Sequence, residues 1–288
     1  MKNKYLCILV AIMLYACGAS EDVTPSGLEQ NMFSSSDFSS PEEMTIRQNF
    51  RDETGIYLIF NDSLCWREVQ TPQGIYRRCE MLNLNYELSA MLSDTFRYTL
   101  LDDIQLKQRM ADFLKDEILP MLPKVMYPYS FFVVDEFYFS ENRGWAGNLP
   151  FALTAAWACY QTTIVGTNGQ FDLSATERYN YKRQLMRGIL LRTYDLLDEK
   201  VYADFYAFCE SMYGEYQSYE EAPMELGFLD AYTMFGWYQK EEDIKGYIYE
   251  IFSMTEEAFK EKYAAWPIVL QKQEVLVEIL EKNGVTVY

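Results

Sequence analysis

Apolar positions follow two different patterns along this chain, and the pattern changes near its middle. In the first half, residues 56–60 and 130–139 form continuous apolar runs rich in β-branched and aromatic residues, which is typical of buried strands. Residues 151–165 have the same character and predict a further strand or strand pair, closed by a turn at Asn168 and Gly169. The first half is therefore expected to carry the sheet.

Helical spacing dominates the second half. Ser174 and Glu177 form a capping-box pattern that opens a long helix. In the first half, Asp103 has the position of a helix N-cap. Further helices are expected over residues 44–52, 103–119, 200–213, 243–252 and 267–282. Another is expected to begin at a cap formed by Ser253 and Glu256.

Strands followed by helices predict an α+β fold rather than alternating α/β units. We expect N-terminal strands followed by a mainly helical C-terminal half, together forming a single globular domain over residues 42–288. Apolar residues make up 49% of the chain, which is enough to bury a core.

The N-terminus is typical of an exported lipoprotein. Lys2 and Lys4 precede an apolar run over residues 5–16, which is too short for a membrane span of about 20 residues but suits a signal peptide. The run ends before Cys17 in a pattern that resembles a lipobox. We therefore predict a signal peptide over residues 1–16, lipidation of Cys17 and a flexible tether over residues 17–41. A plain secretory signal is the alternative.

The predicted location is the outer membrane, with the protein held by its lipid anchor. The acidic residues that follow Cys17, Glu21 and Asp22, resemble the signal that sends some lipoproteins of Bacteroidota to the cell surface. This match is short, so the cell surface and the periplasmic face both stay open.

Charge and composition exclude several functions. The sequence holds 25 Lys and Arg against 43 Asp and Glu, so its formal net charge is −18. Nucleic acid, a polyanion, is therefore not expected as a partner. The chain contains no histidine, which excludes Ser-His-Asp catalysis and zinc sites of the HExxH type. No metal or other cofactor is expected.

The cysteines lack the spacing of a metal site. Cys65 and Cys79 flank a turn signal at residues 72–74, in a region that predicts loops and short strands over residues 61–87. A disulfide between these two cysteines would contribute about 3 kcal/mol to the free energy of unfolding. Cys159 and Cys209 are expected to be buried free thiols.

We consider two other kinds of functional site. Paired carboxylates, of which Asp135 and Glu136 are the first to test, are what a glycosidase requires. Their simpler interpretation is a solvated strand end in an acidic protein. Trp145, between two glycines, is the best candidate for an aromatic ligand contact, although most aromatic residues at this density belong to the core.

Short sequence strings point to a known family. They lie at residues 49–60, which contain NF followed by TGIYLIF, and at residues 227–232 (GFLDAY), 242–244 (EDI) and 270–273 (LQKQ). Their order and spacing resemble a family of bacterial surface lipoproteins described as zinc-binding metallopeptidases, which are found beside TonB-dependent uptake systems. The resemblance covers most of the mature chain and implies a zincin-like scaffold.

The family's zinc motif is degenerate in this sequence. Family members carry two histidines at i and i+4 on one helix, a glutamate base between them, and a downstream acidic ligand. The resemblance places Gln184 and Gly188 at the histidine positions, Leu185 at the base and Gly246 at the third ligand. Leu185 cannot take a proton from water, and Arg187 would repel a metal cation. The resemblance thus implies a pseudoenzyme.

The expected function follows from these points. We expect a catalytically inactive, metallopeptidase-like surface lipoprotein that serves as a binding or accessory component of an outer-membrane nutrient-uptake system. Its partners would be a TonB-dependent transporter with its companion binding lipoproteins, and its ligand a peptide or a glycan. The alternatives are an active hydrolase, either a metallopeptidase with other ligands or a carboxylate-based glycosidase, and a purely structural partner of a transporter.

Overall fold

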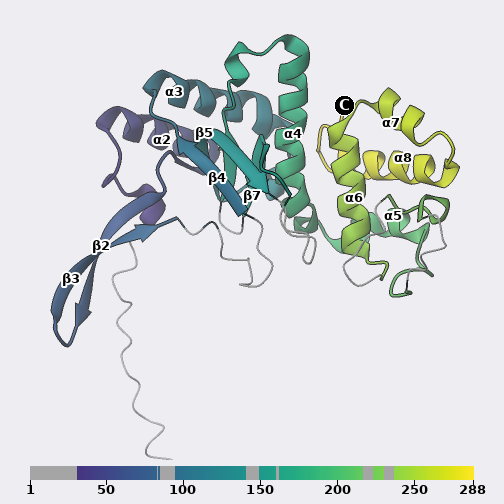
Figure 1. Cartoon of the computed structure of the whole chain (residues 1–288), viewed down its shortest axis with the longest axis horizontal. Helices are drawn as coiled ribbons and strands as arrows, with labels where there is room; N and C mark the ends of the chain where they lie inside the picture. The colour runs from purple at the N-terminus through teal and green to yellow at the C-terminus, as the bar shows by residue number, and fades with distance from the viewer. Residues whose placement is uncertain are drawn as a thin grey trace, which may run out of the picture.

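The computed structural model describes residues 31–82, 84, 95–140, 149–159, 162–216, 223–229 and 237–288. The predicted signal peptide, the lipidation site Cys17 and the candidate contact Trp145 lie outside these residues. Within them, strands belong to the first part of the chain and helices dominate from residue 174 onward (Figure 1). The predicted α+β class is confirmed, and so is its division into a strand-bearing first half and a helical second half.

The sheet is built around β5 (Ser130–Ser140). β1 (Tyr57–Ile59) and β8 (Thr163–Gly166) lie parallel to β5 on its two sides, and β7 (Ala156–Ala158) runs antiparallel to β8. Two further antiparallel strands pair with the second half of β5, namely β4 (Thr95–Leu100) and β6 (Ala152–Leu153).

Both faces of β5 are buried, each in a different cluster. Phe131 and Val133 point into the large core that the helices share. Phe132 and Val134 point into a smaller, aromatic-rich cluster. Because successive strand residues face opposite sides, burial of both faces explains the unbroken apolar run in the sequence. The predicted strands at 56–60 and 130–139 are thus confirmed.

The large core takes side chains from α2 (Pro41–Thr54), α3 (Ile104–Phe113) and α4 (Ala175–Thr193), and also from the helices that follow them. Asp103 caps α3 as predicted, accepting from the backbone N–H groups of Gln105 and Leu106 at 2.8 and 3.0 Å. α3 continues directly into a π-helical turn, Leu114–Ile118. The predicted capping box of Ser174 and Glu177 is also confirmed at the start of α4.

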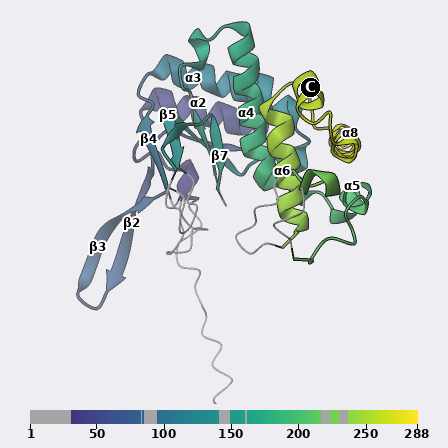
Figure 2. The ribbon, with the colours of Figure 1, turned by 45° about the vertical axis from the view of Figure 1, so that its right-hand side comes forward.

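The C-terminal helices are α6 (Lys240–Ser253), α7 (Glu256–Lys262) and α8 (Pro267–Lys282). Figures 1 and 2 show α4 lying between the sheet and α6, and α4 contacts both β7 and α6. The predicted helices over 243–252 and 267–282 are confirmed, with Pro267 in the first turn of α8. These helices place the C-terminal half beside one edge of the sheet.

Two helix predictions need correction. The helix expected over 200–213 is broken into the short α5 (Ala203–Ala207) with a 3₁₀ turn, Glu199–Tyr202, before it. Ser253 is not the cap of α7. Thr255 caps it instead and accepts from the backbone N–H of Ala258 at 3.3 Å.

The remaining described helices are short 3₁₀ turns, and no helix in the described ranges has the length and apolar character that crossing a membrane requires. The turns lie at Met32–Ser34, Leu119–Met121, Lys124–Met126, Gln170–Asp172, Tyr194–Leu196 and Pro223–Leu226.

A two-stranded hairpin, which we call the hairpin arm, projects from the body of the molecule (Figures 1 and 2). It consists of β2 (Ser63–Thr71) and β3 (Gly74–Met81), joined at the predicted turn. The register pairs Cys65 with Glu80 and Trp66 with Cys79. Cys65 and Cys79 therefore lie on opposite faces of the arm, and both are free. The predicted disulfide is wrong.

The segment before α2 belongs to the fold. Phe33 is buried in the smaller cluster, and the side chain of Arg47 donates to the carbonyl oxygens of Phe33 and Ser35 at 2.7 and 3.0 Å. Such contacts hold a chain in place, so residues 31–41 are not the free spacer that was predicted for them. The segment is polar and rich in serine, yet one of its residues, Phe33, is buried.

Candidate functional site

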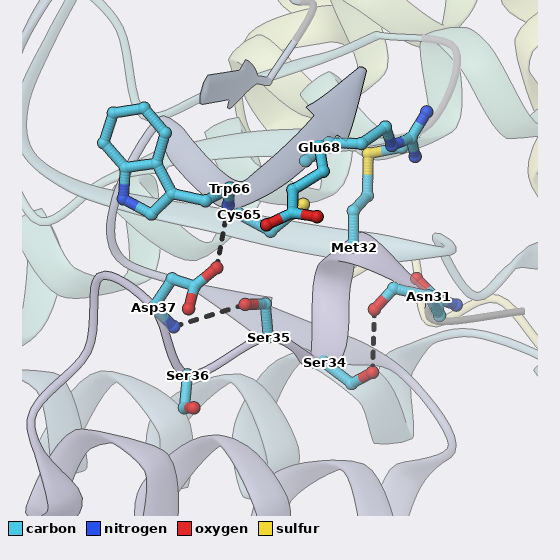
Figure 3. A pocket seen from close by; sticks show the side chains of 10 residues that line it. Asn31, Met32, Ser34, Ser35, Ser36, Asp37, Cys65, Trp66 and Glu68 are labelled. Carbon is cyan, nitrogen blue, oxygen red and sulfur yellow. Dashed lines mark hydrogen bonds between the residues drawn. The ribbon is translucent and has the colours of Figure 1, made fainter. Parts of the chain in front are cut away.

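A groove of about 420 Å³ lies at the base of the hairpin arm, between residues 31–37 and the first residues of β2 (Figure 3). We call it the arm groove. Its lining is mostly polar and combines hydroxyl, carboxylate and guanidinium groups with one indole. The polar groups come from Asn31, Ser34, Ser35, Ser36, Asp37, Arg67 and Glu68.

Hydrogen bonds fix the wall of the arm groove that residues 31–37 form. The Asp37 carboxylate accepts from the backbone N–H of Trp66 at 2.7 Å, which ties this segment to β2. The Ser35 hydroxyl accepts from the backbone N–H of Asp37 at 3.2 Å. Asn31 donates to the hydroxyl groups of Tyr57 and Tyr129 at 2.6 and 2.8 Å. The groove is thus anchored to the sheet at one end and to the arm at the other.

Trp66 supplies the aromatic surface of the arm groove. Its side chain is 44% exposed although it stands on a strand. The ring of Phe38 lies 5.6 Å from it, and the guanidinium of Arg77 lies 5.4 Å from its centroid. These neighbours hold the indole without covering it, so part of it can stack on a bound molecule.

Sequence reasoning selected Trp145 and missed Trp66. One signal could have found it, because Trp66, Glu68 and Gln70 alternate with Cys65, Arg67 and Val69 along β2. A tryptophan on the polar side of such an alternation is expected to be exposed to solvent. Exposed tryptophans are enriched at binding surfaces.

The positions that the resemblance assigns to the lost zinc site lie on α4 and α6, which pack against each other. Leu185 is 0% exposed in the large core. Gly188 faces β7, where a Cβ would lie 2.7 Å from the carbonyl oxygen of Ala156. Gln184 and Gly246 are half-buried. Two of the four positions are therefore taken up by packing in the protein interior.

The donor set at these positions does not fit a zinc ion. Zinc in proteins is held by thiolate, imidazole or carboxylate groups, and none of the four residues supplies one. Arg187, one turn after Gln184 on α4, donates to the Ser253 hydroxyl at 2.7 Å and lies over the ring of Tyr249. Across the described ranges, no group of three or more cysteine and acidic residues is placed to hold a metal ion.

Among the described residues, the carboxylates considered for catalysis do not form an acid–base pair either. Asp135 and Glu136 are successive residues of β5 and point to opposite faces. Thr167 donates to Asp135 at 3.0 Å, and Tyr138 donates to Glu136 at 3.3 Å. Asp103 is occupied as a helix cap, and Asp243 is buried against Lys272. None of these arrangements leaves two acids facing one substrate.

Comparison with protein-family models, with curated proteins and with solved structures finds no match to this chain. The zincin-like scaffold and the relation to metallopeptidase lipoproteins therefore stay predictions from the sequence strings.

Proposed function

We propose that this protein is an exported, lipid-anchored binding protein of the outer membrane, built on a metallopeptidase-like scaffold whose zinc site has been lost. Cys17 is its proposed lipid anchor. Its proposed role is to hold a ligand for a TonB-dependent uptake system, in company with other binding lipoproteins. The zincin-like fold and the outer-membrane location belong to this proposal.

One observation carries the non-catalytic part of the proposal. The resemblance assigns the base to Leu185 and a zinc ligand to Gly188, but Leu185 is buried in the large core and Gly188 packs against β7. A catalytic side chain at either position would displace the core or the backbone of β7. The site is therefore filled by structure, which supports loss of catalysis.

The arm groove supports the binding part of the proposal. It offers a partly open indole beside hydroxyl and carboxylate groups. Sites for small polar ligands combine an aromatic surface with a few converging hydrogen-bonding groups. An oligosaccharide presents apolar C–H faces and many hydroxyl groups, and it matches this lining better than an apolar peptide does. We therefore assign a glycan as the ligand.

Binding to a glycan array, followed by calorimetry on the glycans retained, tests this assignment. We expect Trp66→Ala to bind roughly ten-fold more weakly, because the stacking surface is removed. Trp237 is a matched control, since it is 45% exposed and lies in the C-terminal half, so Trp237→Ala should bind normally. Equal binding by the protein and by Trp66→Ala would refute the arm groove as the site.

A further inference from the structure

Lys272 of α8 is a fully buried cation outside the arm groove. Its ammonium donates to Asp243 at 2.5 Å, to the carbonyl oxygen of Gly227 at 3.1 Å and to the sulfur of Cys209 at 3.2 Å. All three N–H bonds of the ammonium are therefore directed at protein atoms. Three aromatic rings surround the ammonium, those of Phe205, Phe228 and Tyr247.

Cys209 completes this cluster from the segment that follows α5. It is 1% exposed and free, and its thiol donates to the carbonyl oxygen of Leu226 at 3.1 Å. The Lys272 nitrogen and the Cys209 sulfur are thus in direct contact in a site closed to solvent. A lysine nitrogen held against an oxidisable sulfur is the placement that a covalent link between them requires.

Asp243 of α6 is placed to move protons in this cluster. One of its oxygens accepts from Lys272 and also from the Tyr213 hydroxyl at 2.5 Å. Its other oxygen, Oδ1, is buried and has no hydrogen-bond partner among the described residues. A buried carboxylate oxygen without a partner is costly to keep as part of an anion, so this carboxyl group is a suitable proton acceptor within the cluster.

We propose that Cys209 and Lys272 form an oxidative cross-linking site, in which hydrogen peroxide joins the cysteine sulfur to the lysine nitrogen. Such a bond ties α8 to the segment after α5, next to α6. Reduction by an external thiol restores both side chains. The proposal is independent of the arm groove and of its ligand.

The reaction balances with one peroxide. Asp243 takes a proton from Lys272, and the neutral amine then takes the proton of the Cys209 thiol. The thiolate attacks peroxide, the O–O bond breaks and sulfenic acid forms; the leaving hydroxide takes a proton from the Lys272 ammonium and departs as water. The Lys272 amine, now neutral, attacks the sulfur; the S–O bond breaks, the leaving hydroxide takes the proton held by Asp243 and departs as a second water, and the surplus proton on nitrogen passes to Asp243. One thiol, one amine and one peroxide thus give one S–N bond and two waters.

Burial of the cluster slows this reaction. It raises the pKa of the Cys209 thiol, against the opposing effect of the neighbouring Lys272, so the thiolate is scarce. Burial also raises the pKa of the Asp243 carboxyl, which favours the protonated form that the relay needs. The link is therefore expected to form more slowly than oxidation of the half-buried Cys65 and Cys79.

The test is peptide mapping of the full mature chain after treatment with hydrogen peroxide. Cys65, Cys79 and Cys159 are replaced by serine, so that their oxidation does not obscure the result. We expect the peptides that carry Cys209 and Lys272 to be joined, with a mass lower than their sum by about 2 Da from the loss of two hydrogens. Dithiothreitol should separate them.

Two controls keep the result decisive. Cys209→Ser removes the sulfur at almost constant volume, and Lys272→Met keeps an unbranched side chain among the rings but removes the amine. Neither variant should give joined peptides. Should Lys272→Met fail to fold, mapping of the parent protein decides alone. Recovery of Cys209 as a free thiol, or as a sulfinic acid with Lys272 unlinked, would overturn the proposal.

Discussion

Gly188 lies where α4 comes closest to β7, and its lack of a side chain permits this approach. Leu185, one turn earlier on the same helix, is buried in the core. At the residue scale, then, packing explains two of the four positions that the resemblance assigns to the zinc site. Gln184 differs, because its side chain is half-buried and a smaller side chain at this position causes no clash.

This difference predicts effects of different size for two substitutions on α4. Gly188→Ala places a methyl group 2.7 Å from the Ala156 carbonyl oxygen, so the free energy of unfolding should fall by about 1–3 kcal/mol. Gln184→Ala should change it by less than about 0.5 kcal/mol. Urea unfolding measures both. An unchanged or raised stability of Gly188→Ala would show that the glycine is not required for packing.

At the scale of elements, most of the fold follows from local signals. The buried run of β5 and the Asp103 cap were predictable because each depends on residues close together in sequence. The cap of α7 was not, because Ser253 and Thr255 both match a cap pattern. Ser253 is still inside α6, where its hydroxyl donates to the Tyr249 carbonyl oxygen at 2.6 Å.

The capping box of α4 gives a prediction at this scale. In Ser174→Ala the backbone N–H of Glu177 loses its acceptor, and the free energy of unfolding should fall by about 1 kcal/mol. Thr176→Ala is the matched control, since Thr176 is exposed in the first turn of the same helix. Thermal or urea unfolding that shows equal stability for the two variants would contradict a stabilising role for the box.

At the scale of the whole molecule, the arm groove could not have been predicted. It exists because residues 31–37 fold back against β2, through contacts such as that of Asp37 with the Trp66 backbone. Hydrophobic periodicity carries no information about such a contact. The same limit explains the wrong disulfide, because Cys65 and Cys79 are separated by the register of the arm and not by their spacing in sequence.

The metal content of the purified mature chain tests the central claim most directly. Elemental mass spectrometry, without added metal, should find far less than one zinc per chain, and peptide substrates should show no turnover that a chelator abolishes. This result is expected because Gln184, Leu185, Gly188 and Gly246 supply none of the usual zinc donors. About one zinc per chain, with chelator-sensitive hydrolysis, would contradict a non-catalytic binding protein.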